Sequence, residues 1–341
     1  MTVAFGLFDW IDWRDVPLAQ LFEERLQILE AADTAGFTGY HLAEHHATPL
    51  GMAPSPSVFL AAAAQRTRRI RLGPLVFLLP LYSPLRLIGE ICMLDHLSGG
   101  RLDLGVGRGV SPYEVGFHGL DPLRTRAMFQ EALDILVAGL TSDRLTHKGE
   151  HYHYDHVPME LHPLQKPYPP LWYATSNLDS VEWAASHNLN LVGLGPAAAF
   201  RPFVERYREA WPRHVGGAGR LNPHVASPRI AINRQVVVAD TDADAERIVR
   251  AAHPRWAKSF IKLWMDHGDT TYQHRVSVDG ALQHETMLCG SPARVRDQVG
   301  RLIEATGVDY VIACFAWGDL TLSQSMRSLR LFAEHVMPAF R

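Results

Sequence analysis

Two histidines and a carboxylate follow one another at Glu44-His45-His46. A histidine changes charge near neutral pH, so it can take or give a proton, and a neighbouring carboxylate can fix the tautomer of its ring. Adjacent loop residues rarely bind one metal ion together, so a metal would need further ligands from elsewhere. The competing interpretation is that one histidine caps the loop and the other is exposed. The clustering of three such groups favours a catalytic role.

A second histidine-rich stretch runs from His147 to His156, where histidines alternate with Tyr152 and Tyr154. Alternation with a period of two predicts an exposed hairpin that has its tyrosines on one side. A metal-dependent hydrolase built on a barrel typically carries a His-x-His pair after its first strand, and Asp9-Trp10-Ile11-Asp12 occupies that place here. We therefore predict no metal site.

Two further segments have the composition of an anion-binding site. In Gly105-Val106-Gly107-Arg108-Gly109, the glycines let backbone amides approach a phosphate, and Arg108 can donate a charge-assisted pair of hydrogen bonds to it. Ser176 and Asn177 stand just before Asp179-Ser180, at the expected start of a helix whose free N–H groups also attract anions. Ordinary N-capping by Asn177 or Asp179 is the competing interpretation, and one loop can do both.

Alternating strands and helices must position these residues, because short β-branched or apolar runs alternate with stretches of 3.6-residue periodicity along the chain. The predicted strands span 2–8, 39–42, 71–78, 102–106, 171–174, 189–194, 229–238 and 308–315. The predicted helices span 18–35, 57–67, 84–97, 123–138, 178–187, 199–211, 292–306 and 322–336, with one more beginning near Asp242. Eight strands favour a closed TIM (β/α)8 barrel over an open doubly wound sheet.

In such a barrel the residues that follow strand ends form the catalytic face. The histidine cluster, Arg108 and the Ser176 loop all follow predicted strands, so they are expected at the same end. Residues 254–290 are rich in histidine, aspartate and aromatics and lack clean periodicity. We interpret them as the largest insertion, between strands 7 and 8 of a single domain that spans 1–341.

The composition excludes several classes of protein. A net charge of -3 without runs of lysine and arginine argues against a nucleic-acid partner. The N-terminus has no basic residue before Arg14, and the longest apolar run, Leu72 to Leu81, is too short to span a bilayer, so we expect a cytoplasmic protein. The three cysteines lie far apart without a Cys-x-x-Cys spacing, and we interpret them as reduced, mostly buried thiols.

Several segments together resemble the bacterial-luciferase-like, flavin-dependent monooxygenases. They keep the order of that family through nearly the whole chain, and the likeness is weakest over 196–290. The segments are EHH, LGPLVFLLPLYSPLR, LDHLSGGRLDLGVGRG, SVEWAA, GVDYVI and LRLFAEHVMP.

The resemblance implies a TIM barrel that binds reduced FMN and a separate NAD(P)H-dependent flavin reductase that supplies it. Dioxygen would add to the flavin as a C4a-peroxide, which oxidises a small organic substrate. It also implies a homodimer, and helices 57–67 and 84–97 are the predicted interface, with Ala61 to Ala64 allowing close approach and Leu87, Ile91 and Leu94 as an apolar stripe.

Carried over by position, the resemblance assigns His45, beside Glu44, as the catalytic histidine. The Leu75-Val76 bond matches a non-proline cis peptide beneath the flavin. The residues that match the FMN-binding positions are Leu75, Val76, Gly107, Arg108, Ser176, Asn177 and Ser180. Gly107 stands where the light-emitting enzyme has a reactive cysteine and Ser176 replaces an acidic residue, which argues against light emission and a long-chain aldehyde substrate.

Flavin oxygen chemistry needs apolar walls with few proton donors. The candidate wall residues are Phe8, Leu75, Val76, Phe77 and Trp317. Two other functions are compatible with the same resemblance: an oxidoreductase using deazaflavin F420 or FMN without oxygen insertion, whose F420-using relatives generally lack the EHH element, and a flavin-binding protein without turnover.

Overall fold

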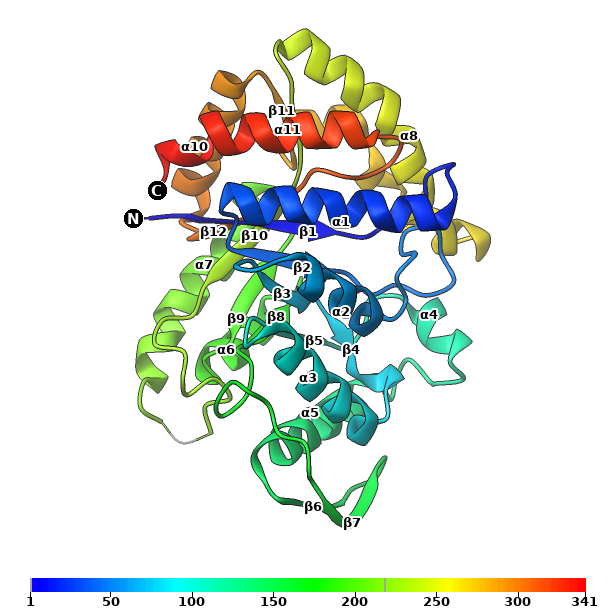
Figure 1. The fold of residues 1–341 in the computed structure, drawn as a ribbon, viewed down its shortest axis with the longest axis vertical. Helices are drawn as coiled ribbons and strands as arrows, with labels where there is room; N and C mark the ends of the chain where they lie inside the picture. The colour runs from blue at the N-terminus through cyan, green and yellow to red at the C-terminus, as the bar shows by residue number, and fades with distance from the viewer. Residues whose placement is uncertain (1, 218) are drawn as a thin grey trace.

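A curled parallel sheet forms the centre of the structure, a computed structural model that describes residues 2–217 and 219–341. Its strands follow the order β3-β2-β1-β12-β10-β9-β8-β5-β4, with β11 beside β10. Because β3 and β4 are consecutive in the chain yet stand at opposite ends of this order, the sheet curls into a nearly closed barrel (Figure 1). The strands are β1 (Ala4–Asp9), β2 (Gly39–Leu42), β3 (Arg71–Pro74), β4 (Phe77–Leu78), β5 (Leu104–Gly107), β8 (Leu171–Ala174), β9 (Asn190–Gly193), β10 (Ile230–Val238), β11 (Met287–Gly290) and β12 (Tyr310–Cys314).

The third predicted strand is divided into β3, which pairs with β2, and β4, which pairs with β5. Between them the Leu75-Val76 peptide bond is cis, as the resemblance implied. A bridge from Leu72 to Leu102 brings the two ends of the sheet together, and a Cβ on Gly105 would lie 2.1 Å from the carbonyl oxygen of Pro74. Glycine is therefore required where the barrel closes. With β3 and β4 counted as one strand, and with β11 set aside because it pairs only with β10, the barrel has eight strands and the predicted (β/α)8 barrel is confirmed.

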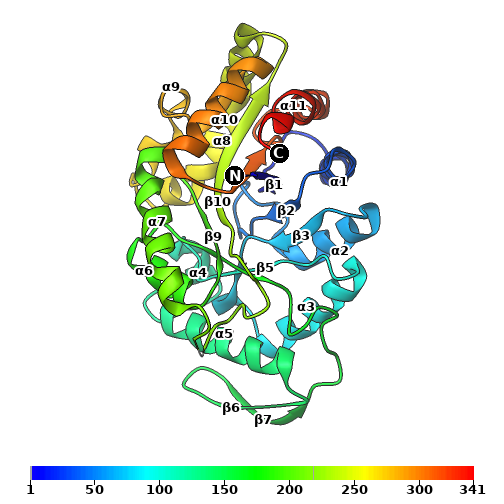
Figure 2. The same ribbon diagram turned by 90° about the vertical axis from the view of Figure 1, so that its left-hand side faces the viewer.

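Helices cover the outside of the barrel (Figures 1 and 2). Helix α1 lies beside α11, and the chain termini meet nearby, where the backbone N–H of Val3 donates to the carbonyl of Phe340. α1 buries Leu21 and Leu29 against the barrel and ends at Gly36 in the left-handed conformation, as predicted. The covering helices are α1 (Leu18–Ala35), α2 (Pro56–Arg66), α3 (Pro84–Ser98), α5 (Thr125–Thr141), α6 (Asp179–Ser186), α7 (Ala197–Ala210), α10 (Pro292–Thr306) and α11 (Leu322–His335), and the single-turn helices η1 (Leu79–Leu81), η2 (Trp211–His214) and η4 (Met337–Ala339) lie between or after them.

The connection from β10 to β12 differs from the prediction. Helical periodicity was expected to fail at residue 254, but α8 (Asp242–Asp266) continues through Pro254 to its end. Trp256, Leu263 and Trp264 recur at helical spacing and are buried, so packing maintains the helix where the mixed composition obscured its pattern. The chain then forms η3 (Gln273–Val276), α9 (Val278–Gln283) and β11, none of which the sequence predicted.

The histidine-rich stretch forms the predicted antiparallel hairpin, β6 (Arg144–Lys148) and β7 (His153–Pro158), apart from the barrel. His147 Nε2 lies 3.0 Å from Oε1 of Glu131 on α5, and the same carboxylate accepts hydrogen bonds from the backbone of His151 and Tyr152. These contacts attach the hairpin to α5. Across residues 2–217 and 219–341, no three His, Cys, Asp or Glu side chains gather as metal ligands.

The residues chosen for the dimer interface have the wrong orientation. Leu87, Ile91 and Leu94 of α3 are buried in the core between the helices and the barrel, because the apolar stripe of a covering helix packs inward. The outward large apolar residues are instead Val58 of α2, 73% exposed, and Met93 and Leu97 of α3, 56% and 45% exposed. Any interface on these helices would use that outward face.

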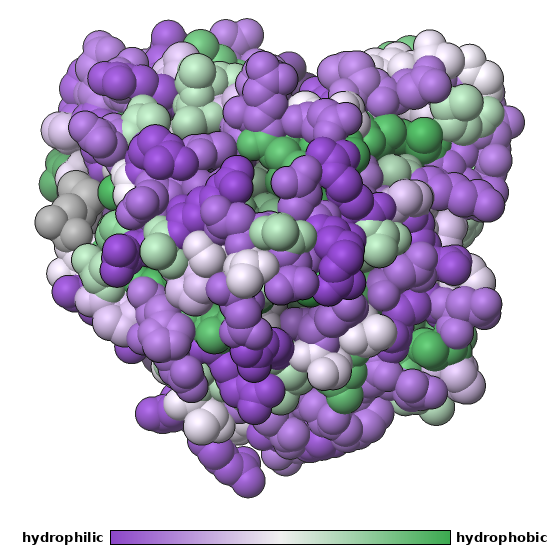
Figure 3. All heavy atoms as spheres, turned by 90° about the horizontal axis from the view of Figure 1, so that it is seen from above, coloured by the Kyte–Doolittle hydropathy of each residue, from purple (hydrophilic) through white to green (hydrophobic). Residues whose placement is uncertain are grey.

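The surface and the core divide as expected for a folded barrel. Figure 3, seen from above, shows a mostly hydrophilic surface with scattered apolar patches. Cys92, Cys289 and Cys314 are buried free thiols without disulfide bonds, as the sequence predicted. None of the helices in the described parts of the chain combines the length and the apolar character needed to span a bilayer.

Candidate active site

A short helix brings a buried carboxylate to the histidine cluster. Helix α4 (Pro112–Phe117) follows β5, and its N-cap Ser111 accepts a hydrogen bond from the backbone N–H of Glu114 at 3.3 Å. Glu114 is only 1% exposed. Its side chain turns toward the loop after β2, so α4 connects the C-terminal ends of β2 and β5.

Glu114 holds His45 directly. His45 Nδ1 lies 3.1 Å from Glu114 Oε1, and the same oxygen accepts the backbone N–H of His46 at 2.7 Å. Nε2 of His45 makes no hydrogen bond with a described residue, and the side chain is 18% exposed. A carboxylate that accepts from Nδ1–H leaves Nε2 free to exchange a proton with a bound molecule.

Sequence reasoning missed Glu114, which lies 69 residues from its partner. The pattern Ser111-Pro112-Tyr113-Glu114 does carry a signal, because a serine three residues before a glutamate marks a helix start. That signal predicts α4 but gives no information on where the glutamate side chain points.

Glu44 precedes His45 in the sequence, but its carboxylate makes its hydrogen bonds with other residues. Its Oε1 lies 2.8 Å from His46 Nε2, and its Oε2 accepts from the backbone N–H of Leu78 at 3.1 Å and the hydroxyl of Tyr82 at 2.9 Å. Burial, and then the Glu44 charge, raise the pKa of Tyr82. Glu44 therefore fixes the loop to the end of β4 and to the segment after it, while Glu114 is the carboxylate that contacts His45.

Arg108 follows β5 at the same end of the barrel. The side chain is exposed, and no described residue accepts a hydrogen bond from its guanidinium or pairs with it. Packing explains why the preceding residue, Gly107, is a glycine, because a Cβ there would lie 2.4 Å from Cγ2 of Val76. The glycine thus lets the Leu75-Val76 segment pack on β5, and Arg108 is left free to bind an external anion.

The Ser176 loop follows β8, which pairs with β5, so it lies beside the Arg108 segment. Asn177 Oδ1 accepts from the backbone N–H of Asp179 at 3.0 Å, and Ser180 Oγ donates to the carbonyl of Asn177 at 2.8 Å. The N-cap position of α6 is Leu178, which makes no side-chain cap, so the Asn177 side chain closes the turn before the helix and the predicted N-cap position is wrong by one residue. Ser176 and Asn177 are exposed, so polar groups at the start of α6 are also accessible to a ligand.

Apolar side chains line the barrel interior below these loops. Leu75 belongs to a buried cluster against which Phe8 and Val76 pack, so three of the predicted wall residues lie together. Phe77 does not contribute to these walls. It packs in the core outside the barrel, with its ring 5.4 Å from that of Tyr82, because successive side chains of a strand face opposite sides.

Aromatic residues of α8 cover part of the same end. Trp256 lies 5.8 Å from Trp10, measured between ring centroids, and both share a buried cluster with Trp317. His267, just after α8, stacks on Tyr113 of α4 with ring centroids 4.0 Å apart. Through the adjacent residues Tyr113 and Glu114, α4 therefore contacts both the end of α8 and the catalytic histidine candidate.

The carboxylates at the end of β1 and in the loop after it form a separate buried network. Arg25 of α1 donates to Asp12 at 3.1 Å, the hydroxyl of Tyr40 donates to Asp9 at 3.1 Å, and the backbone N–H of Gly318 donates to Asp12 at 2.6 Å. Burial raises the pKa of Asp12 to about 7. These side chains contact α1 and one another, so we assign them a role in holding the loop after β1.

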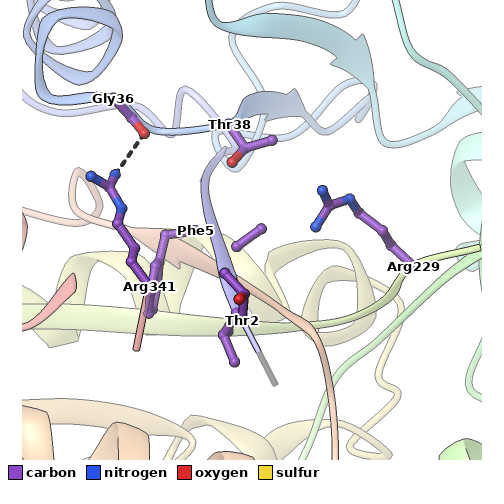
Figure 4. Close-up of a pocket in the computed structure, with 8 residues that line it drawn as sticks. Thr2, Phe5, Gly36, Thr38, Arg229 and Arg341 are labelled. Atoms are coloured by element: carbon purple, nitrogen blue, oxygen red, sulfur yellow. Dashed lines mark hydrogen bonds between the residues drawn. The ribbon is translucent and has the colours of Figure 1, made fainter. Parts of the chain in front are cut away.

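The opposite end of the barrel contains a different polar group. His41 Nε2 lies 2.9 Å from the hydroxyl of Tyr310, and burial lowers the pKa of His41 to about 3. Beyond Tyr310, a pocket of about 330 Å³ opens at the N-terminal end of β1 between Arg229 and Arg341 (Figure 4). Active sites of such barrels lie at the C-terminal ends of the strands, so we place the site around His45 and Arg108.

Comparison with known proteins agrees with the sequence resemblance. Residues 4–310 match the family described as luciferase-like monooxygenases. An uncharacterised protein of Sinorhizobium fredii, y4wF, is 38% identical over 98% of this chain and 96% of its own length. The oxygenase component of flavin-dependent trigonelline monooxygenase from Acinetobacter baylyi is 30% identical over 94% of this chain and 90% of its own.

A solved structure shows the same fold. The oxygenating constituent of 3,6-diketocamphane monooxygenase from Pseudomonas putida, in complex with FMN, has a TM-score of 0.82 at 24% identity and covers 99% of both chains. The fold expected from the sequence is therefore found in a solved protein over nearly its full length.

Proposed function

Because the chain belongs to the luciferase-like monooxygenase family, we propose that it is the oxygenase of a two-component, FMN-dependent system that oxidises a small organic substrate. Reduced FMN would supply electrons to O2 and carry the activated oxygen to the substrate. A separate NAD(P)H-dependent reductase would provide the reduced flavin, as the words "oxygenase component" in the name of the trigonelline relative suggest. The addition of dioxygen to the flavin as a C4a-peroxide, which the family resemblance implies, stays a prediction.

The observation that carries the proposal is the convergence of complementary groups at one end of the barrel. Arg108 pairs with no residue in 2–217 or 219–341, and the polar loop of Ser176, Asn177 and Ser180 follows the neighbouring strand. Together they offer a phosphate a guanidinium, hydroxyls and helix N–H groups. Leu75 and Val76 would contact the flavin ring, because they form the apolar wall next to these polar groups.

The proton chemistry would depend on His45. Glu114 fixes the ring through Nδ1, so Nε2 is the atom that exchanges a proton with the substrate or the oxidised product. The apolar walls and the aromatic side chains of α8 would exclude water from the reaction. We further propose that residues 1–341 act as one domain, in which the 254–290 segment is an insertion that shapes the substrate site.

The first experiment is to titrate the protein anaerobically with chemically reduced FMN and, in parallel, with reduced F420. The proposal expects binding of FMN with one site per chain and clearly weaker binding of F420. Preferential binding of F420 would favour the oxidoreductase alternative. Binding of FMN without any change in its reaction with O2 would favour a flavin-binding protein without turnover.

A homodimer through the outward faces of α2 and α3 is a second part of the proposal. Val58 and Met93 leave apolar surface there, and Gly89, one turn before Met93 on α3, has open space above it, which allows close approach of another helix. Light scattering at micromolar concentration should give twice the chain mass, and Met93→Lys should shift the mass to that of one chain. A wild-type monomer would contradict this part.

A further inference from the structure

Two amide side chains inside the barrel have hydrogen-bond donors without partners. Asn233 and Gln235 of β10 are each only 7% exposed. Nδ2 of Asn233 and Nε2 of Gln235 are buried and make no hydrogen bond with any residue in 2–217 or 219–341. Buried amides are normally satisfied, so two such groups on one strand point to a missing acceptor.

Both side chains face the barrel interior. Side chains alternate along a strand, and Ala231, which has the same parity, lies in the interior cluster with Leu75 and Trp172. In the sheet, Asn233 stands beside Ile312, another member of that cluster, and Gln235 stands beside Cys314. The two side chains therefore face the same interior side of the sheet, one above the other.

Their strand lies across the barrel from the predicted flavin wall. In the order of the sheet, β10 is four strands from β3 by one path and four strands from β4 by the other. Leu75 and Val76, between β3 and β4, are therefore on the opposite side of the ring. A molecule placed between that wall and β10 would present one edge to Asn233 and Gln235.

The surroundings of Gln235 are apolar and aromatic. Its neighbours in the sheet, Cys314 and Met287, belong to the buried cluster of Trp256 and Trp317. The indole N–H groups of both tryptophans are also buried without an acceptor. The only charged side chain adjacent on the strand, Arg234, has the opposite parity and thus faces away from the interior.

These observations indicate the chemistry of the occupant. An amide N–H donates to a carbonyl or hydroxyl oxygen but supplies no charge to compensate an anion. We propose that Asn233 and Gln235 form a substrate subsite that binds a neutral carbonyl oxygen and thereby selects neutral, ring-containing carbonyl compounds over carboxylates. The inference rests on the proposed function, because it needs the flavin on the opposite wall. A carbonyl group of the flavin is the alternative acceptor for the same two amide donors.

The test uses three probes of matched shape: acetophenone, α-methylstyrene, which replaces its carbonyl by a methylene group, and benzoate. Their affinities for the FMN-loaded protein are measured by titration calorimetry or saturation-transfer NMR. The wild type should prefer acetophenone over each of the other two by about tenfold, the scale of one or two neutral hydrogen bonds. A ratio near one in the wild type overturns the proposal.

Two variants locate the preference. Asn233→Leu and Gln235→Met should each lower the ratio of acetophenone to α-methylstyrene affinity several-fold without lowering the melting temperature, because neither removes a satisfied hydrogen bond. Gln298→Met is the matched control, since Gln298 is also buried but accepts from the backbone N–H of Cys289 at 3.0 Å. It should lower the melting temperature and leave the probe ratio unchanged.

The remaining outcomes separate the sources of the acceptor. If the variants keep the probe ratio but bind FMN several-fold more weakly, the flavin carbonyl is the partner and the substrate subsite is wrong. If they keep both the ratio and the FMN affinity but melt at lower temperature, the amides are structural, which also overturns it. Failure of the proposed function is read separately, as absence of FMN binding by the wild type.

Discussion

Two histidines four residues apart show how position in the barrel decides their chemistry. His41 lies within β2, faces the barrel interior and contacts Tyr310. His45 lies in the loop after the same strand and contacts Glu114. Burial lowers the pKa of His41 to about 3, so it stays neutral at physiological pH. His45 instead has a carboxylate partner on Nδ1 and an accessible Nε2.

The comparison shows that the base and the mouth of the barrel have different roles. Toward the base, the His41 ring is buried and contacts the hydroxyl of Tyr310, so we assign it a role in the fold. At the mouth, the Arg108 guanidinium and Nε2 of His45 make no hydrogen bond within the described parts of the chain, so both can bind or react with an added molecule. Four predictions test this difference between the base and the mouth of the barrel, from the largest expected effect to the smallest.

Replacing the histidine of the mouth should abolish most activity. His45→Ala should lose about 100-fold or more in product formation, the usual scale for a positioned acid or base, and should release more hydrogen peroxide per NADH consumed. FMN affinity and melting temperature should stay near those of the wild type. Lost FMN affinity with unchanged coupling would instead make His45 a structural residue like His41.

Removing the free cation should weaken cofactor binding selectively. Arg108→Ala should reduce the affinity for reduced FMN by about 1.5 to 3 kcal/mol, the range for a charged hydrogen bond. Riboflavin, which lacks the phosphate, should bind wild type and variant alike. An equal loss for both flavins, or no loss for FMN, would remove the phosphate role from Arg108.

The histidine of the interior should govern stability at low pH. The native state keeps His41 neutral down to about pH 3, whereas the unfolded chain takes up a proton near pH 6.5. Between these values the unfolded state binds more protons, so stability falls as pH falls. From pH 8 to pH 5 the free energy of unfolding should drop by about 2 kcal/mol through this residue.

Asp12, whose pKa burial raises to about 7, changes stability in the opposite direction over the same range. The His41 contribution is therefore measured as the difference in pH dependence between the wild type and His41→Gln in urea unfolding at the two pH values. His41→Gln should show a smaller dependence on pH, and His45→Ala serves as the control that keeps it. The same dependence in the wild type and in His41→Gln would show that other groups cause the acid sensitivity.

The smallest effect is expected from the carboxylate behind His45. Glu114→Gln keeps an oxygen for the two hydrogen bonds but loses the charge, so turnover should fall about tenfold while FMN still binds. Adding His45→Ala to this variant should cost little more than His45→Ala alone, because the two residues act together. Glu44→Gln is the matched control, and additive losses for Glu114 and His45 would contradict a shared role.

Local sequence patterns predicted the framework well. α1, β2, β8 and α10 have the predicted bounds, because each has a clear apolar period and a glycine or proline near a boundary. The barrel end that holds His45, Arg108 and Ser176 also followed from sequence, since each segment directly follows a strand. These features depend on neighbours within a few residues.

Features that depend on distant contacts were missed. Glu114 could not be paired with His45, and Phe77 could not be placed outside the barrel, because their positions follow from how α4 and β4 lie in three dimensions. The continuation of α8 past Pro254 depends on the burial of Trp256 and Trp264, which sequence composition alone does not give.

The most direct test of the account is to mix the anaerobic complex of the protein and reduced FMN rapidly with oxygenated buffer and follow the flavin absorbance. We expect a transient spectrum that differs from both reduced and oxidised FMN and that decays faster when His45 is replaced by alanine. Oxidation at the rate and with the spectra of free reduced FMN would contradict the assignment as an oxygenase.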